Sequence, residues 1–204
     1  FQVPAGIAHY LEHKLFDMPG RDISAEFAAL GAIPNAFTSY EITAYHFSCT
    51  ENFPQSLRLL LEFVFTPCFT QESVDKEQGI IGQEIRMYDD EGSWQVAINM
   101  LKALYHNNPV RIDIAGTVES IAEIDKDVLY RCYNSYYNPG NMAVTVCGDV
   151  DVDEVFSIVD RCFDTDVPGS EVQSLLPEEP DSICQRYIET HCAVAIPMFS
   201  LGFK

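Results

Sequence analysis

The spacing of apolar residues predicts a chain that changes between helices and strands without regular alternation. Apolar positions at helical spacing, bounded by Pro or Gly, predict helices over residues 6–16, 24–30, 54–65, 71–89, 93–106, 125–137 and 153–163. Rough alternation rich in Thr, Tyr and Phe predicts two strands, possible partners in a hairpin, within residues 35–50. We expect further strands in MAVTVCGDV (residues 142–150) and within residues 183–204. Mixed elements of this kind favour an α+β domain.

The composition indicates a globular chain and argues against two classes of partner. Of the 204 residues, 47% are hydrophobic, and no apolar run reaches the length of a membrane span. A net charge of −19 would repel nucleic acid and anionic membranes. Seven cysteines, an odd number without CxxC spacing, indicate reduced thiols, so we expect a cytoplasmic protein.

The candidate chemistry begins in GIAHYLEHKLF, residues 6–16, which holds two of the five histidines. On a helix, His9, Glu12 and His13 occupy positions i, i+3 and i+4 and share one face. Two imidazoles on that face can hold a zinc ion, and Glu12 can take the proton of a zinc-activated water. The spacing is the H-x-x-E-H signature of the inverzincins. The pentapeptide alone is also compatible with polar residues on a partly buried helix, and a zinc site needs a third ligand.

Two glutamates downstream can complete such a site. Glu77 and Glu84, in SVDKEQGIIGQEIRMYDD, lie seven residues apart, nearly two helical turns, and therefore line one helix face. One could bind zinc while the other supports a ligand. A solvated acidic helix face would have the same spacing, so these residues alone leave both interpretations open.

Three linked motifs together resemble the insulinase/pitrilysin family of zinc peptidases. They are HYLEH at residues 9–13, NAFTS at residues 35–39 and EQGIIGQEIRMYDD at residues 77–90. Two stretches, GIIGQEIRMYDD and PVRIDIAGTVESI, look more closely like the bacterial processing-peptidase-like branch of that family. The resemblance covers nearly the whole chain and implies a mostly antiparallel sheet with helices packed on it.

The family pattern gives each motif a role. Carried over residue by residue, the resemblance implies that His9, His13 and Glu84 are zinc ligands and that Glu12 is the catalytic base. It implies that Glu77 is a supporting acid, which orients a ligand histidine.

The NAFTS motif matches the strand that lies beside the zinc in this family and binds substrate. The implied substrate-binding residues are Asn35, Ala36, Phe37 and Thr38. An exposed strand edge offers unpaired N–H and C=O groups, to which an extended peptide can add as another strand. An ordinary turn and strand is the alternative for these residues.

Members of the family have two homologous halves that close around the peptide. The resemblance therefore implies a zinc-bearing N-terminal peptidase domain over residues 1–164, which lacks its first strand. Pro, Ser and acidic residues are concentrated between this domain and the C-terminal strands, which predicts a linker or exposed loop over residues 165–182. Residues 183–204 would be the last strand of the domain or the start of the second half. The implied partners are peptide substrates and a second homologous half or subunit, in a homo- or heterodimer.

We therefore expect a zinc-dependent metalloendopeptidase that hydrolyses short unstructured peptides with zinc-activated water and a glutamate base. A non-catalytic binding or assembly subunit of the same fold, paired with an active homologue, is the main alternative. Such members usually lose part of the ligand set, whereas this chain has all four functional positions. A hydrolase of the same zinc chemistry that acts on a small molecule is a second alternative.

Overall fold

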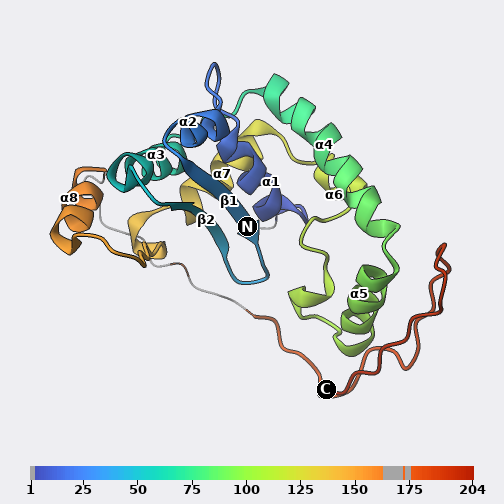
Figure 1. Ribbon diagram of the computed structural model, residues 1–204. Coiled ribbons are helices and arrows are strands. Elements are labelled where there is room, and N and C mark those ends of the chain that lie inside the picture. Colours follow the sequence, from blue (N-terminus) through green and yellow to red (C-terminus); the bar gives the residue numbers. More distant parts are fainter. Residues whose placement is uncertain (1–2, 163–171, 173–175) are drawn as a thin grey trace.

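A two-stranded antiparallel hairpin lies at the centre of the computed structural model, which describes residues 3–162, 172 and 176–204 (Figure 1). The hairpin joins β1 (Ala32–Thr38) to β2 (Thr43–Cys49), with Ala32 opposite Cys49 and Thr38 opposite Thr43. The described α-helices are α1 (Ile7–Phe16), α2 (Ile23–Ala29), α3 (Phe53–Phe65), α4 (Gln71–Asp89), α5 (Gly92–Leu104), α6 (Val118–Ile121), α7 (Lys126–Tyr136) and α8 (Val152–Cys162). Two 3₁₀ turns are η1 (Pro109–Arg111) and η2 (Pro139–Asn141). The predicted α+β class and the predicted hairpin are confirmed.

Side-chain caps explain why several helices begin where they do. Thr70 and Ser73 form a reciprocal capping box at the start of α4, and Asp22 accepts a hydrogen bond from the backbone of Ala25 at the start of α2. The short α6, which the sequence pattern did not predict, begins with the same kind of box between Thr117 and Ser120. Among the described residues, no helix is both long and apolar enough to cross a membrane.

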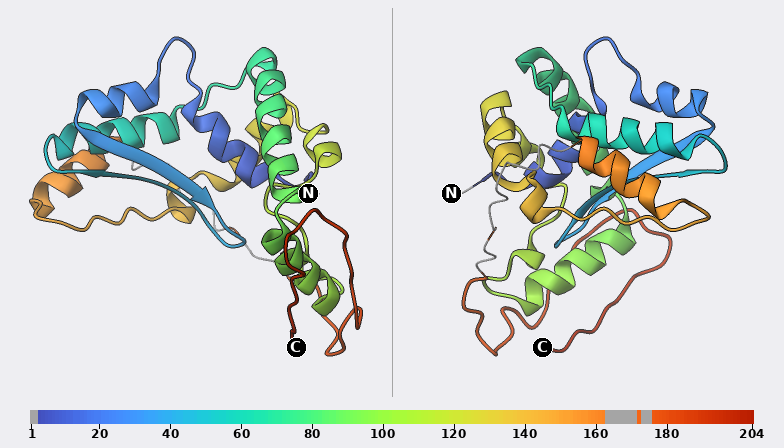
Figure 2. Two further views of the ribbon diagram at one scale, coloured as in Figure 1. Left: turned by 45° about the vertical axis from the view of Figure 1, so that its right-hand side comes forward. Right: turned by 90° about the vertical axis from the view of Figure 1, so that its left-hand side faces the viewer.

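The two faces of the hairpin have different environments. Helices α1, α2 and α3 pack on one face (Figure 2), where aromatic rings meet: Phe47 lies 5.7 Å from Phe27, and Tyr45 lies 6.1 Å from Phe63, between ring centroids. The opposite face carries exposed side chains, among them Ile33. In the part of the chain that the structure describes, the helices therefore anchor the hairpin through one of its two faces.

The hydrogen-bond pattern of the hairpin fixes which backbone groups of β1 point to its free edge. The N–H of Ser39 donates to the carbonyl of Ile42 (2.8 Å), which makes these two a hydrogen-bonded pair at the turn. Because such pairs alternate along an antiparallel ladder, the backbone N–H and C=O groups of Ala36 and Thr38 point away from β2. Pro34 has the same parity, so its missing N–H costs no ladder bond.

Two contacts fix helix α1 against neighbouring segments, one in the middle of the helix and one at its start. Tyr10 is fully buried, and its hydroxyl donates to the carbonyl of Val74 in α4 (2.6 Å). At the start of α1, Gly6 has a φ of 93°, and a Cβ there would lie 2.5 Å from the carbonyl oxygen of Ala115. Only glycine fits this approach, so α1 is fixed against α4 and against the turn at residues 113–116.

Two predicted strand regions are not strands in the structure. Residues 142–150 and 183–204 contain no paired strand, and apolar side chains in them stay exposed, including Val144, Ile196 and Phe199. Apolar alternation favours extended backbone, but a strand also needs a neighbour to accept its hydrogen bonds, and that neighbour cannot be read from the segment itself. Both predictions were wrong for this reason.

The C-terminal segment packs along α5 instead of joining the sheet (Figure 1). The N–H of Gln185 donates to the carbonyl of Ala103 (2.9 Å). The carboxylate of Glu179 accepts the backbone N–H groups of residues 106–108 at 2.7–2.8 Å and forms an ion pair with Lys204. The predicted linker lies largely outside the described residues, and the division at residues 164 and 182 stays a prediction.

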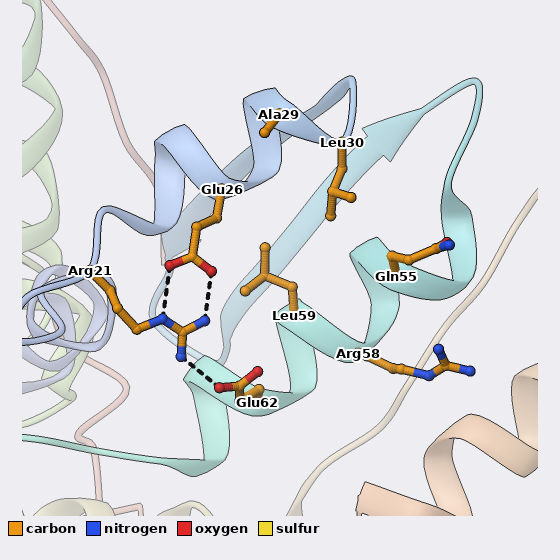
Figure 3. Close-up of a pocket in the computed structure, with 8 residues that line it drawn as sticks. All are labelled: Arg21, Glu26, Ala29, Leu30, Gln55, Arg58, Leu59 and Glu62. Carbon is orange, nitrogen blue, oxygen red and sulfur yellow. Dashed lines mark hydrogen bonds and ion pairs between the residues drawn. The ribbon is translucent and has the colours of Figure 1, made fainter.

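An arginine-centred cluster joins α2 to α3 on the side of the fold shown in Figure 3. The guanidinium of Arg21 donates to both carboxylate oxygens of Glu26 (2.8 and 2.6 Å) and to Glu62 (2.6 Å). These groups line a surface depression with Leu59 and Arg58. The charge of Arg21 is matched by Glu26 and Glu62, so the cluster links α2 to α3.

A buried lysine in α1 generates the first testable prediction. The Lys14 side chain has no exposed surface and forms an ion pair with Asp17, the residue that ends the helix. Replacing Asp17 with Asn should lower the free energy of unfolding by about 1–3 kcal/mol, because it leaves a buried ammonium without its counter-charge. Lys14→Met should leave stability within about 1 kcal/mol of the wild type or raise it.

Urea unfolding measures both variants, and Asp127→Asn provides the control. Asp127 pairs with Lys126 on the surface, so its loss should leave the free energy of unfolding close to the wild-type value. If Lys14→Met destabilised the protein more than Asp17→Asn did, the buried pair would be a net source of stability and the prediction would be wrong.

Candidate metal centre

Helix α1 presents three functional side chains beside its buried face. Tyr10, Leu11 and other apolar residues turn into the core, while His9, Glu12 and His13 remain partly buried. The rings of His9 and His13 lie 4.6 Å apart between centroids, at an interplanar angle of 68°. The helical spacing therefore brings both imidazoles to one site, as the sequence predicts.

Glu77 fixes the orientation of the second imidazole. His13 Nδ1 lies 3.0 Å from Glu77 Oε1. Because a carboxylate only accepts, Nδ1 carries the hydrogen, and the Nε2 lone pair of neutral His13 is free for a ligand. This hydrogen bond raises the pKa of His13, while burial opposes the rise.

His9 has the opposite electrostatic environment. Burial lowers the pKa of His9, and the neighbouring His13 lowers it further, so the imidazole is held neutral. Its Nδ1 atom is buried without a hydrogen-bond partner among the described residues. A neutral imidazole with Nε2 turned toward a carboxylate is the form that binds a metal ion.

Glu84 brings the third donor atom from α4. Its Oε2 atom lies 3.7 Å from His9 Nε2 and 3.5 Å from His13 Nε2. One ligand atom from each of the three residues lies within 4.8 Å of the others. Zinc–ligand bonds of about 2.0–2.2 Å set ligand–ligand separations of about 3.3–3.6 Å in a tetrahedron, so the donor set fits a zinc-sized ion.

Glu12 lies on the same face and has a different partner. Its Oε2 atom accepts a hydrogen bond of 2.5 Å from the hydroxyl of Thr38, at the end of β1. Glu12 is not part of the convergent His-His-Glu group. The carboxylate of Glu12 is thus hydrogen-bonded to the hairpin and does not join Glu84 in the group of candidate ligands.

The four predicted substrate residues lie on β1 with alternating directions. The Asn35 side chain accepts the N–H of Ala36 (2.9 Å), in agreement with an outward-pointing N–H at that position. Phe37 is 47% exposed on the open face of the hairpin, where its ring lies 6.3 Å from that of His46. The hydroxyl of Thr38 reaches the candidate centre, where it donates to Glu12.

Two further pairs near the centre were not predicted from the sequence. The hydroxyls of Tyr45 and Tyr137 lie 2.7 Å apart, and burial raises the pKa of both, to about 12 for Tyr137, with a contribution from the charge of Glu12. Trp94 donates to Asp113 (2.7 Å), whose charge acts on His9. No local motif signals either pair, although Trp94 is the one tryptophan of the chain.

Comparison with known families gives two adjoining matches. Residues 3–118 match the sequence profile of the insulinase family, peptidase family M16. Residues 123–203 match the profile named the peptidase M16 inactive domain. The first match contains every residue of the candidate centre on α1, β1 and α4.

Individual proteins show the same similarity. The uncharacterized zinc protease YmfH of Bacillus subtilis is 51% identical over 157 residues, which cover 77% of this chain and 37% of YmfH. The uncharacterized zinc protease YmxG of the same organism is 31% identical over 163 residues, or 78% of this chain and 40% of YmxG.

Among solved structures, the crystal structure of an M16-like peptidase from Alicyclobacillus acidocaldarius is similar to this fold. It matches with a TM-score of 0.85 and 41% identity, over 91% of this chain and 44% of that chain. The chain therefore spans less than half the length of the relatives that it matches.

The bond from Glu77 to His13 predicts a measurable effect on metal affinity. Glu77→Gln should weaken binding of Zn²⁺ or Co²⁺ by about ten- to a hundredfold. A neutral amide can donate as well as accept, so it neither fixes the tautomer of His13 nor raises its basicity as the carboxylate does. Titration of the complete polypeptide against a competing chelator measures the affinity.

Glu72→Gln is the matched control for that titration, because Glu72 lies in the exposed first turn of the same helix. We expect it to bind the metal as the wild type does. Equal affinities of the wild type and Glu77→Gln would contradict a supporting role for Glu77.

Proposed function

The chain belongs to the insulinase family of peptidases, peptidase family M16, and we propose that it is the metal-bearing part of a zinc metalloendopeptidase acting on short unstructured peptides. The observation that carries this proposal is the convergence of two imidazole nitrogens and one carboxylate oxygen beside a separate carboxylate, Glu12. Because the chain spans less than half of its relatives, the activity is proposed for the complete polypeptide.

We assign the metal ligands to His9 and His13 of α1 and Glu84 of α4. Nitrogen and carboxylate donors in a set of three are typical of catalytic zinc, which keeps one further position open. When bound, zinc would polarise a peptide carbonyl and lower the pKa of water to about 7. The names of YmfH and YmxG as zinc proteases support this choice of metal.

We assign proton transfer to Glu12. Its carboxylate borders the ligand face without belonging to the ligand set, so it is free to take a proton from the attacking water. The same carboxylate can then deliver that proton to the leaving amine. Glu77 acts only through His13, which it orients.

The free edge of β1 is the proposed docking site for the peptide. The outward N–H and C=O groups of Ala36 and Thr38 can pair with an extended backbone, which gives affinity that depends little on sequence. Asn35 must release the N–H of Ala36 when a peptide pairs there. Phe37, exposed on the open face, is suited to contact an apolar side chain of the substrate.

A second homologous half or subunit is the proposed partner. This domain supplies the metal ligands, the base and the strand β1 on one side of the peptide. The second half or subunit would enclose the peptide from the other side. The non-catalytic alternative is less consistent with this chain, because all three donors and Glu12 are retained. We also propose a reducing, cytoplasmic location, on the basis of seven cysteines without paired spacing.

Removing the carboxylate of Glu12 tests the mechanism. In the complete polypeptide, Glu12→Gln should lower the rate of cleavage of a quenched fluorescent peptide by about 10²–10⁴-fold, because it removes the proton acceptor. Zinc content should stay at the wild-type level, since no ligand atom is lost. Glu84→Gln, as the comparison, should lose both zinc and activity.

Normal cleavage by Glu12→Gln would refute the assignment of the base. A wild-type polypeptide that binds no zinc and cleaves no peptide would instead support the non-catalytic alternative.

A proline substitution tests the docking edge. Ala36→Pro removes one outward N–H without breaking the ladder, and Pro34 occupies a position of the same parity in the same strand. Loss of one backbone hydrogen bond should raise KM by about three- to tenfold while zinc content is unchanged. Ala36→Ser, which keeps the N–H, is the control and should retain the wild-type KM. An unchanged KM in Ala36→Pro would exclude pairing at this position.

A further inference from the structure

On the premise of the function proposed above, we infer that Thr38 is a positioning residue, whose hydroxyl orients the carboxylate of Glu12. The side chain of Thr38 has this role, whereas the backbone of Thr38 has the separate role in peptide docking. Two hydrogen bonds at the end of the hairpin support the inference, together with the oxygen atom of Glu12 that these bonds leave free.

The first contact is short and has a defined direction. Thr38 Oγ1 lies 2.5 Å from Glu12 Oε2, and both groups are partly buried. An ionised carboxylate can only accept, so the hydroxyl hydrogen of Thr38 points to Glu12. Bonds between a hydroxyl and a carboxylate at about 2.5–2.7 Å are among the stronger hydrogen bonds of proteins.

The second contact orients Thr38 itself. Thr43 Oγ1 lies 3.3 Å from Thr38 Oγ1, and the two residues face each other at the last rung of the hairpin. Because the single hydrogen of Thr38 is directed to Glu12, Thr43 must be the donor in this contact. The result is a chain of hydrogen bonds from Thr43 through Thr38 to Glu12, in which each bond polarises the next.

This arrangement divides the two oxygens of Glu12 between two tasks. Oε2 is anchored to the hairpin, whereas Oε1 has no hydrogen-bond partner in the part of the chain that the structure describes. A glutamate on a helix has several rotatable bonds, so anchoring one oxygen restricts where the other can lie. Oε1 is therefore the atom available to exchange a proton beside His9 and His13.

Thr38 also connects the base to the proposed docking edge. Its backbone groups point to the free edge of β1, while its side chain points to α1. A peptide that pairs with β1 would consequently be aligned by the same residue that orients Glu12. Loss of the hydroxyl should then impair the chemical step and leave the backbone contacts of the peptide intact.

Matched substitutions separate positioning from a merely structural role. Thr38→Val keeps the shape of the side chain but removes the hydroxyl, and Thr38→Ser keeps the hydroxyl. In the complete polypeptide, Thr38→Val should lower kcat by about 10- to 100-fold with KM changed less than about twofold. Thr38→Ser should recover kcat to within about threefold of the wild type.

Zinc content and urea unfolding are measured on each variant, with Ser48→Ala on the exposed face of β2 as the control. We expect the control to match the wild type in kcat, KM and stability. A wild-type kcat in Thr38→Val would overturn the inference, as would equal losses of kcat in Thr38→Val and Thr38→Ser.

A readout without catalysis keeps the assignment testable if the proposed function fails. In crystals of the metal-free Thr38→Val protein, the carboxylate of Glu12 should leave its wild-type position, while the backbones of α1 and the hairpin superpose. An unmoved carboxylate would overturn the inference. An inactive wild type would refute the proposed function, and the crystal comparison would still decide whether Thr38 orients Glu12.

Discussion

The contact between α1 and α4 is the constraint on which the candidate centre depends. Two nitrogen donors and Glu12 come from α1, while the third donor, Glu84, comes from α4. Tyr10 locks the two helices together, because its ring is fully buried and its hydroxyl binds the backbone of α4. A shift of one helix along the other by a single residue, about 1.5 Å, would separate donors that now lie 3.5–3.7 Å apart.

The hairpin contributes to the candidate centre through β1, whose backbone groups and side chains point in different directions. Along β1, backbone groups at one parity point to the free edge, and the Thr38 side chain at that parity points to α1. Substrate contact and control of Glu12 can therefore come from the same short strand. Helices anchor the hairpin through its aromatic face, and among residues 3–162, 172 and 176–204 no strand pairs with the outer edge of β1.

Local signals explain how much of this could be predicted from the sequence. Helix starts follow capping residues such as Thr70, and the spacing of His9 and His13 gives their shared face directly. The sequence pattern named Glu77 and Glu84 as candidates for a third ligand. The choice of Glu84 rested on a family resemblance, because 71 positions separate it from His13 and no local pattern states which helices meet.

The features that sequence analysis missed are non-local. The strands expected in residues 142–150 and 183–204 failed because extended backbone becomes a strand only beside a partner. The bond from Thr38 to Glu12 likewise joins residues 26 positions apart, and its direction follows from hydrogen-bond chemistry rather than from spacing. Periodicity therefore identified most of the helices and the hairpin, whereas contacts between elements require the fold.

Anomalous diffraction at the zinc edge, from crystals of the complete polypeptide grown with Zn²⁺, would locate the metal ion directly. We predict one strong peak within about 2.0–2.2 Å of His9 Nε2, His13 Nε2 and a carboxylate oxygen of Glu84, with Glu12 outside bonding distance. A peak bound by other residues, or no peak between α1 and α4, would contradict it.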